Sequence, residues 1–209
     1  MDNNWKPWID YPEVTEEYLS IVADIIRQAR KDTLRLYDPV HGDDSWSHGC
    51  RAFVRSKFAL IEGSKTYAWL SLLDEVPRLR ATFAICGRPF RFYRGIPEEP
   101  PSNYLSTTFA EIRQLQWVLK FDGNGLRPID KILRLAVETD EQGEATDITL
   151  VEVDEVGNVT NSYVIPAAVA KSNVIPAQTP AIDVQPPVVD PKKTEGQNAQ
   201  EKAKKKKNE

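Results

Sequence analysis

The chain has 209 residues, of which 41% are hydrophobic and 28% are charged. This is the composition of an ordinary globular protein of about one domain, and it excludes a fibrous or wholly disordered chain. The net charge of −4 is unevenly divided: residues 166–209 hold eight lysines and five acids, whereas the rest holds 19 basic and 26 acidic residues. Binding of a polyanion would therefore depend on a local basic patch and not on bulk charge.

Cysteine usage and the start of the sequence predict a cytoplasmic location. The two cysteines, Cys50 and Cys86, form no CxxC pair and cannot build a disulfide framework. The first residues are polar and acidic, unlike a signal peptide. No apolar run approaches the roughly 20 residues of a membrane span, so we expect no membrane segment.

The first half of the chain predicts an arm and two helices. We expect residues 1–14 to form an extended arm whose aromatic side chains pack on the core. Thr15 is a good N-cap for a helix over 16–31. A loop with two turns follows, and residues 47–73 then predict one long helix. The predicted apolar face of that helix consists of Cys50, Val54, Phe58, Ile61, Ala68 and Leu72.

The second half predicts mainly strands. Residues 79–86 and 90–94 alternate as a β-hairpin, and Thr107 or Thr108 begins a helix that ends near Phe121. Pro128 suits the start of a short helical turn. Three segments separated by glycine-containing turns predict a β-meander, over 132–139, 147–154 and 159–165.

Together these elements predict an α+β fold with antiparallel strands. The expected domain, residues 1–165, has about three helices, an arginine-rich hairpin and a C-terminal antiparallel meander. Residues 166–209 are rich in proline, alanine and lysine and contain no aromatic residue. Such a segment cannot bury enough apolar surface to offset chain entropy, so we expect a disordered tail.

One face of the long predicted helix indicates a catalytic or phosphate-binding site. At 100° per residue, the side chains of four polar residues fall within about 60° of one another. Arginines beside a carboxylate and an imidazole suit phosphate binding, or phosphodiester cleavage by general acid–base catalysis. A partly buried ion network or a solvated helix face is the alternative. The four residues are His48, Arg51, Arg55 and Glu62.

Residues 51–63, RAFVRSKFALIEG, resemble a core helix of HEPN-type proteins, which are helical nucleases. The cleaving signature of that family is an arginine followed by a histidine on a later helix. No histidine follows His48, so the resemblance implies a relative that does not cleave.

The loop before this helix suggests a metal site. Imidazole and carboxylate groups suit zinc, manganese or iron, and His41, Asp43 and His48 lie within eight residues. The alternative is a polar loop in which Asp and Gly form turns. A divalent metal at these three residues is the only cofactor that the sequence suggests.

The hairpin indicates a nucleic-acid surface. Aromatic rings can stack on unpaired bases while guanidinium groups bind phosphates. Alternation places Phe90 and Phe92 on one face and Arg91 and Tyr93 on the other, which also fits a core face opposite an exposed face. The candidate residues are Arg78, Arg80, Arg88, Phe90, Arg91, Phe92, Tyr93 and Arg94, with Lys204, Lys205, Lys206 and Lys207 in the tail.

The leading hypothesis is a non-catalytic binding or adaptor module, as in bacterial or phage accessory systems. It would contact nucleic acid or an acidic protein through the hairpin and the lysine-rich tail. One alternative is a phosphodiester-cleaving enzyme that uses the helix face. The other is a structural homodimer, because residues 138–155 contain eight acids and no base and could pair with the arginines of the hairpin.

Overall fold

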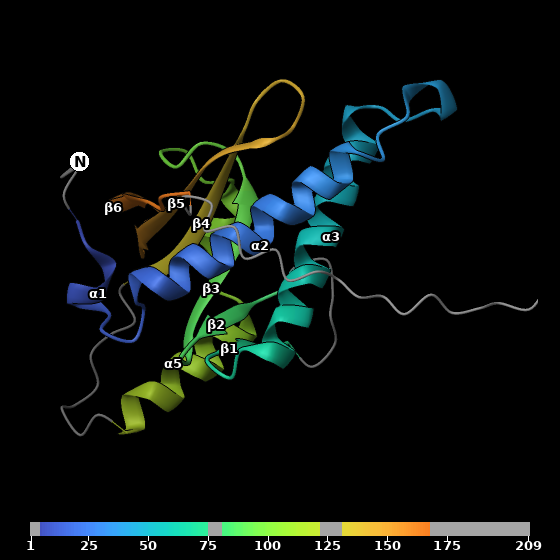
Figure 1. Ribbon diagram of the computed structural model, residues 1–209. Coiled ribbons are helices and arrows are strands. Elements are labelled where there is room, and N and C mark those ends of the chain that lie inside the picture. Colours follow the sequence, from blue (N-terminus) through green and yellow to red (C-terminus); the bar gives the residue numbers. More distant parts are fainter. Residues whose placement is uncertain (1–4, 75–80, 122–130, 168–209) are drawn as a thin grey trace, which may run out of the picture. The chain divides into compact units, whose positions relative to one another are not determined.

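The computed structural model describes residues 5–74, 81–121 and 131–167, which belong to one compact unit spanning Met1–Lys171. The fold is α+β, as predicted (Figure 1). Its helices are α1 (Pro7–Asp10), α2 (Glu16–Leu34), the 3₁₀ turn η1 (Pro39–His41), α3 (Ser45–Thr66), α4 (Ser102–Leu105) and α5 (Phe109–Phe121). Its strands are β1 (Leu70–Leu72), β2 (Phe83–Ile85), β3 (Arg88–Arg94), β4 (Lys131–Thr139), β5 (Ala145–Asp154) and β6 (Val159–Val164).

The six strands form one sheet in chain order. The predicted hairpin is β2–β3, and the predicted meander is β4–β5–β6; both are antiparallel. The expectation of antiparallel strands throughout is wrong at one place, because β3 and β4 run parallel, with Phe92 opposite Leu135. Parallel neighbours require a crossover connection, and here α4 and α5 lie within it. The sheet is therefore mixed.

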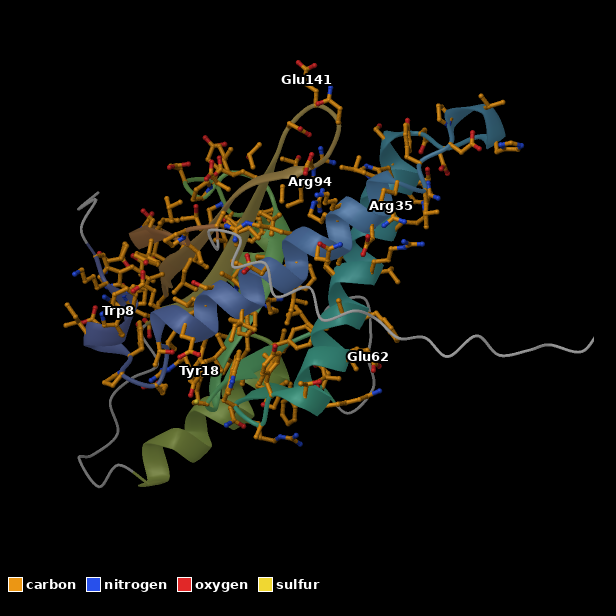
Figure 2. The ribbon with its side chains drawn as sticks, in the orientation of Figure 1. Trp8, Tyr18, Arg35, Glu62, Arg94 and Glu141 are labelled. Carbon is orange, nitrogen blue, oxygen red and sulfur yellow. The ribbon has the colours of Figure 1, made fainter. Side chains whose placement is uncertain are left out.

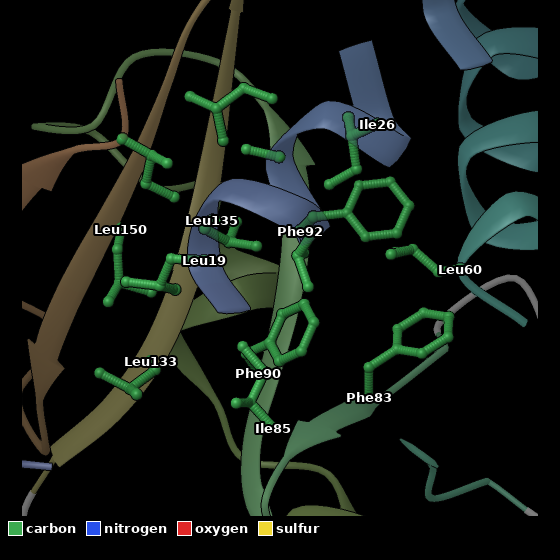
Figure 3. Close-up of a cluster of buried hydrophobic side chains, with 14 of the residues drawn as sticks. Leu19, Ile26, Leu60, Phe83, Ile85, Phe90, Phe92, Leu133, Leu135 and Leu150 are labelled. Carbon is green, nitrogen blue, oxygen red and sulfur yellow. The ribbon is translucent and has the colours of Figure 1, made fainter. Parts of the chain in front are cut away.

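Helices α2 and α3 cover one face of the sheet (Figure 1). Thr15 caps α2 as predicted, since its Oγ1 accepts a hydrogen bond from the Tyr18 amide at 3.2 Å. Side chains at helical spacing on α2 then meet the aromatic residues of β2 and β3 (Figure 3). This core includes Leu19, Val22, Ile26, Leu60, Phe83, Phe90, Phe92, Leu133, Leu135 and Leu150.

The opposite face of the sheet packs against the segment that contains α4 and the start of α5. Its apolar cluster is small and includes Tyr93, Ala136 and Val151. Beside it lie buried charges: Arg134 donates to a Glu111 oxygen at 2.5 Å. Phe90 and Phe92 therefore face the main core and Tyr93 faces the other side, as the alternation predicted.

Helix α3 differs from its prediction in length and in orientation. It ends at Thr66, and Leu70–Leu72 pairs with β2 as a strand. Its buried face consists of His48, Ala52, Ser56 and Leu60, whereas Val54 and Phe58 are exposed. Small residues on the buried face allow close packing: a Cβ on Gly63 would lie 3.1 Å from Ile25 Cδ1.

The N-terminal arm is partly helical, which corrects the expectation of an extended arm. Residues 7–10 form the single turn α1, with Pro7 at its first position. The arm packs on the core as expected, since Tyr11 and Val14 are buried. The Tyr11 hydroxyl donates to Glu152 Oε2 at 2.5 Å and so joins the arm to β5.

Several predictions lie outside the described residues: Arg78, Arg80, the helical turn after Pro128, almost all of the tail, and Lys204 to Lys207 within it. In the part of the chain that the structure describes, no helix has both the length and the apolar character to cross a membrane.

Candidate anion-binding site

The turn between β4 and β5 forms the base of the site. Gly143 in this turn has a φ of +90°, a conformation that favours glycine. Its carbonyl oxygen accepts hydrogen bonds from Arg30 of α2, at 2.9 Å from Nη2 and 3.3 Å from Nε. Only 4% of Arg30 is exposed, so this carbonyl holds a guanidinium group inside the protein.

His48 lies against the same glycine from the first turn of α3. Asp44 caps this helix with a capping box, in which its side chain accepts from the Ser47 amide at 2.7 Å. The His48 ring is so close to Gly143 that a Cβ atom added to this glycine would lie 2.5 Å from Cε1 of His48. Tyr37 meets the ring edge to face, with centroids 5.3 Å apart. The Nε2 atom of His48 is buried and has no hydrogen-bond partner.

Two further arginines complete the site. Arg94, exposed at the end of β3, donates from Nε to Thr139 Oγ1 at 3.0 Å. Its Nη1 approaches α3, since a Cβ on Gly49 would lie 3.8 Å from it. Figure 2 shows Arg94 between α2 and the β4–β5 turn. Arg51, one turn along α3 from His48, forms an ion pair with Asp43.

We call Arg30, His48, Arg51 and Arg94 the arginine–histidine cluster. Burial lowers the pKa of His48 below its ordinary value, and the charges of Arg30, Arg51 and Arg94 lower it further, against a smaller effect of Asp43. At neutral pH the imidazole is therefore uncharged. Burial and the charge of Arg94 lower the pKa of Arg30 to about 10, so that side chain stays cationic.

The cluster is suited to an anion. It holds three guanidinium groups, whereas Asp43 is the one carboxylate that forms an ion pair with a member of the cluster among the described residues. The groups come from α2, α3 and β3, so folding brings them together. A phosphate or carboxylate oxygen near Arg94 and Arg51 would meet charge-assisted donors that arginine presents in a fixed plane.

The structure joins two of the predicted sites. His48 and Arg51 were predicted on a helix face and Arg94 on the hairpin, and the pKa of His48 responds to both arginines. The other two members of the predicted helix face are used elsewhere. Arg55 donates to the Asp32 carbonyl at 3.4 Å, and Glu62 accepts from Lys65 at 2.6 Å.

The rest of the predicted hairpin surface that the structure describes is buried or paired. Phe90 and Phe92 lie in the main core, and Tyr93 is 2% exposed. Burial raises the pKa of Tyr93. Arg88 donates to Glu13 at 2.8 Å, and its guanidinium lies 4.7 Å from the centre of the Tyr11 ring. None of the three hairpin aromatic residues presents a ring face to solvent.

Arg91 is 1% exposed and belongs to a second group of buried charges. It neighbours Arg134 across the parallel pair of strands, and both face Glu111 at the start of α5. Backbone carbonyl groups receive the remaining donors, including Ser106 from Arg91 at 2.5 Å and Tyr104 from Arg134 at 2.7 Å. We call Arg91, Arg134 and Glu111 the closed cluster.

Two of the three residues suggested for a metal, His41 and Asp43, have other partners. His41 Nδ1 contacts Asp38 at 2.7 Å, Asp43 pairs with Arg51, and His48 lies beneath the β4–β5 turn. Within residues 5–74, 81–121 and 131–167, no group of three His, Cys, Asp or Glu side chains is placed to hold a metal ion.

Arg30 is the member of the cluster that sequence reasoning missed. The buried face of α2 runs through Val22, Ile26 and Thr33, and Arg30 follows Ile26 by four residues on that face. A charged residue in line with an apolar stripe is the signal that could have revealed it, because a buried charge needs a partner.

No family model matches this sequence, and the comparisons with curated proteins and solved structures found no significant similarity. The resemblance of residues 51–63 to a HEPN helix is thus a likeness of one segment. Functional inference therefore depends on the geometry of the site.

Proposed function

We propose that this protein is a non-catalytic binding module that holds the phosphates of single-stranded nucleic acid at the arginine–histidine cluster. The observation that carries the proposal is the buried His48 Nε2 without a partner, beside three arginines from three elements. A polar atom buried without a partner is destabilising unless something else offsets it. A bound anion would bridge the arginines and favour a protonated, donating His48.

A ring near the cluster supports nucleic acid as the ligand. Tyr37 contacts His48 and is 40% exposed, so it can stack on an unpaired base next to a bound phosphate. The net charge of the chain is negative, which weakens long-range attraction. We therefore expect modest, sequence-tolerant affinity that falls as salt rises.

The test is binding of labelled single-stranded RNA by the full-length chain at several salt concentrations. Arg94→Gln removes an exposed cluster charge and should weaken binding about tenfold, with the salt slope reduced by about 0.7. Arg113→Gln is the matched control, because Arg113 is an exposed arginine of α5, on the other side of the sheet. Replacing Lys204 to Lys207 by glutamine measures the contribution of the tail in the same chain.

Equal losses for Arg94→Gln and Arg113→Gln would contradict the proposal, since only bulk charge would then matter. Failure to bind RNA, together with salt-sensitive binding of a polyglutamate peptide that Arg94→Gln weakens, would assign the cluster to an acidic protein partner instead.

The phosphodiester-cleaving alternative has one favourable feature, a neutral His48 whose buried Nε2 has no hydrogen-bond partner and could accept a proton, as a general base requires. The predicted second group, Glu62, is bound to Lys65 more than three helical turns further along α3. Cleavage of RNA that His48→Gln abolishes and Glu62→Gln preserves would establish an enzyme with His48 as its base. Intact RNA after prolonged incubation would remove this alternative.

A further inference from the structure

The outer face of α3 carries large apolar side chains that no described part of the chain covers. Trp46, Cys50, Val54 and Phe58 follow one another at intervals of four residues, so they form one stripe along the helix. Trp46 is 75% exposed, Val54 46% and Phe58 60%, and Cys50 is exposed too. We call these four residues the α3 stripe.

The stripe contradicts the usual division of an amphipathic helix. On α3 the buried side chains include the small residues Ala52 and Ser56 as well as Leu60, while the large apolar side chains of Trp46, Val54 and Phe58 face outward. Half of the large hydrophobic residues exposed in the described part of the chain lie within 36–58. They are Leu36, Tyr37, Val40, Trp46, Val54 and Phe58. Such a concentration of exposed apolar groups typically marks an interaction surface.

We propose that the α3 stripe is the contact surface for a second copy of this chain. In this dimer the two α3 helices pack antiparallel about a two-fold axis next to Val54. A two-fold interface is self-complementary, so each residue meets the residue equally far from Val54 in the opposite direction. Val54 therefore faces Val54 of the second copy, Phe58 meets Cys50, and Trp46 lies opposite Glu62.

The charges of α3 favour this antiparallel arrangement. Asp43 and Asp44 lie at its N-terminal end, and Lys65 lies in its last turn. The two-fold axis brings Lys65 of one copy, which pairs with Glu62 of its own helix, to Asp43 and Asp44 of the other, where Asp43 pairs with Arg51 of its own chain. Lys65 and Asp43 each lie eleven residues from Val54, and Asp44 lies ten residues from it. The helix dipoles also oppose each other in this arrangement. A parallel pair would instead place like charges together.

The size of the surface predicts a weak dimer. Helix α3 has 22 residues and is about 33 Å long. One helix pair buries less than the roughly 800 Å² per partner of a standard interface. We therefore expect a dissociation constant in the micromolar range. The exposed side chains of Leu36 and Val40, near the N-terminal end of α3, can add some contact area.

Sedimentation of the full-length chain over a range of concentrations tests the dimer. Phe58→Glu should raise the dissociation constant at least about tenfold, because it buries a charge in the apolar contact. Val156→Glu is the matched control: Val156 is 84% exposed in the β5–β6 turn, and its substitution should leave the dissociation constant unchanged. Both sites are exposed, so both variants should fold.

Cross-linking tests the arrangement. In a chain with Cys50→Ala and Cys86→Ala, Val54→Cys should form an intermolecular disulfide, because the two-fold axis brings this position next to itself. Phe109→Cys, 79% exposed on α5, should not cross-link faster than random collision. A chain that is monomeric at all concentrations overturns the proposal. So does a dimer that Phe58→Glu leaves intact or that Val54→Cys fails to cross-link.

Discussion

The molecule contains two groups of arginines, and they differ in how their charges are satisfied. In the closed cluster, Glu111 lies between Arg91 and Arg134, at 3.4 and 2.5 Å, and is itself 1% exposed. In the arginine–histidine cluster, Arg30 has a backbone carbonyl as its partner, Arg94 has a threonine hydroxyl, and a buried imidazole nitrogen has none.

This difference separates a structural from a functional use of the same residue type. The closed cluster supplies its own anion and is shielded from water by α4 and α5, so a ligand has no place in it. Among the described residues, Asp43 is the one carboxylate that forms an ion pair with the arginine–histidine cluster, and the cluster members Arg51 and Arg94 reach solvent. An external anion can complete the second cluster, and this contrast leads to four predictions.

The largest effect is expected where the closed cluster loses its anion. Glu111→Gln leaves two buried guanidinium groups without a counter-charge and should lower the free energy of unfolding by about 3–5 kcal/mol. Denaturant unfolding measures it. Glu141→Gln, at the exposed tip of the β4–β5 turn (Figure 2), should change stability by less than about 0.5 kcal/mol. A loss for Glu111→Gln as small as that of the control would mean that the closed cluster contributes little to stability.

A smaller loss of stability should follow when Gly143, on which the arginine–histidine cluster packs, is substituted. Gly143→Ala adds both backbone strain and a clash with the His48 ring, and should lower stability by about 2–4 kcal/mol. Gly42→Ala has nearly the same φ, +93°, but meets no atom within 4 Å, so it should cost about 1 kcal/mol. Equal losses in the two variants would show that the His48 ring moves freely out of contact.

The smallest effect should be the pH dependence that His48 confers. Because the folded state lowers the pKa of His48, the unfolded chain takes up a proton first as the pH falls. The contribution of His48 to stability is therefore complete above about pH 6.5 and declines below it, until the folded pKa is also passed. Unfolding midpoints between pH 8 and 5 should show this decline in the natural chain and lose it in His48→Gln.

The same measurement in phosphate buffer tests the contrast directly. A bound anion favours protonated His48, so phosphate should reduce the decline at low pH, whereas chloride at equal ionic strength should not. If phosphate has no effect beyond ionic strength, the cluster does not bind this anion.

Much of the fold could be predicted because it depends on neighbouring residues. Thr15 caps α2, and Thr108 forms a capping box with Glu111 at the start of α5, in bonds of 2.7 and 3.2 Å. The turns of the meander were also recognisable from their glycines, and in the structure Gly143 and Gly157 have the positive φ angles that favour glycine. Caps and turns are local, and a single sequence contains all the information that they need.

The site was predictable only in part. His48, Arg51 and Arg94 were recognised as chemically interesting residues, but on two separate surfaces. Their meeting depends on how α3 packs beside α2 and β3, and residues 48 and 94 are far apart in the chain. Arg91 was assigned to a potential binding surface, although its carboxylate partner Glu111 comes from the crossover between β3 and β4.

The sequence by itself determined the α+β class, helix α2, the hairpin and the meander, because periodicity and local hydrogen bonds define them. Only the tertiary structure decided that β3 and β4 are parallel, that α3 buries its small residues and exposes Val54 and Phe58, and that Arg30 meets His48 at Gly143. The physical reason is the range of the interactions. Packing, burial and charge pairing join residues that are distant in the chain. A periodic pattern shows that a helix or strand has an apolar face, but it does not specify which other element packs against that face.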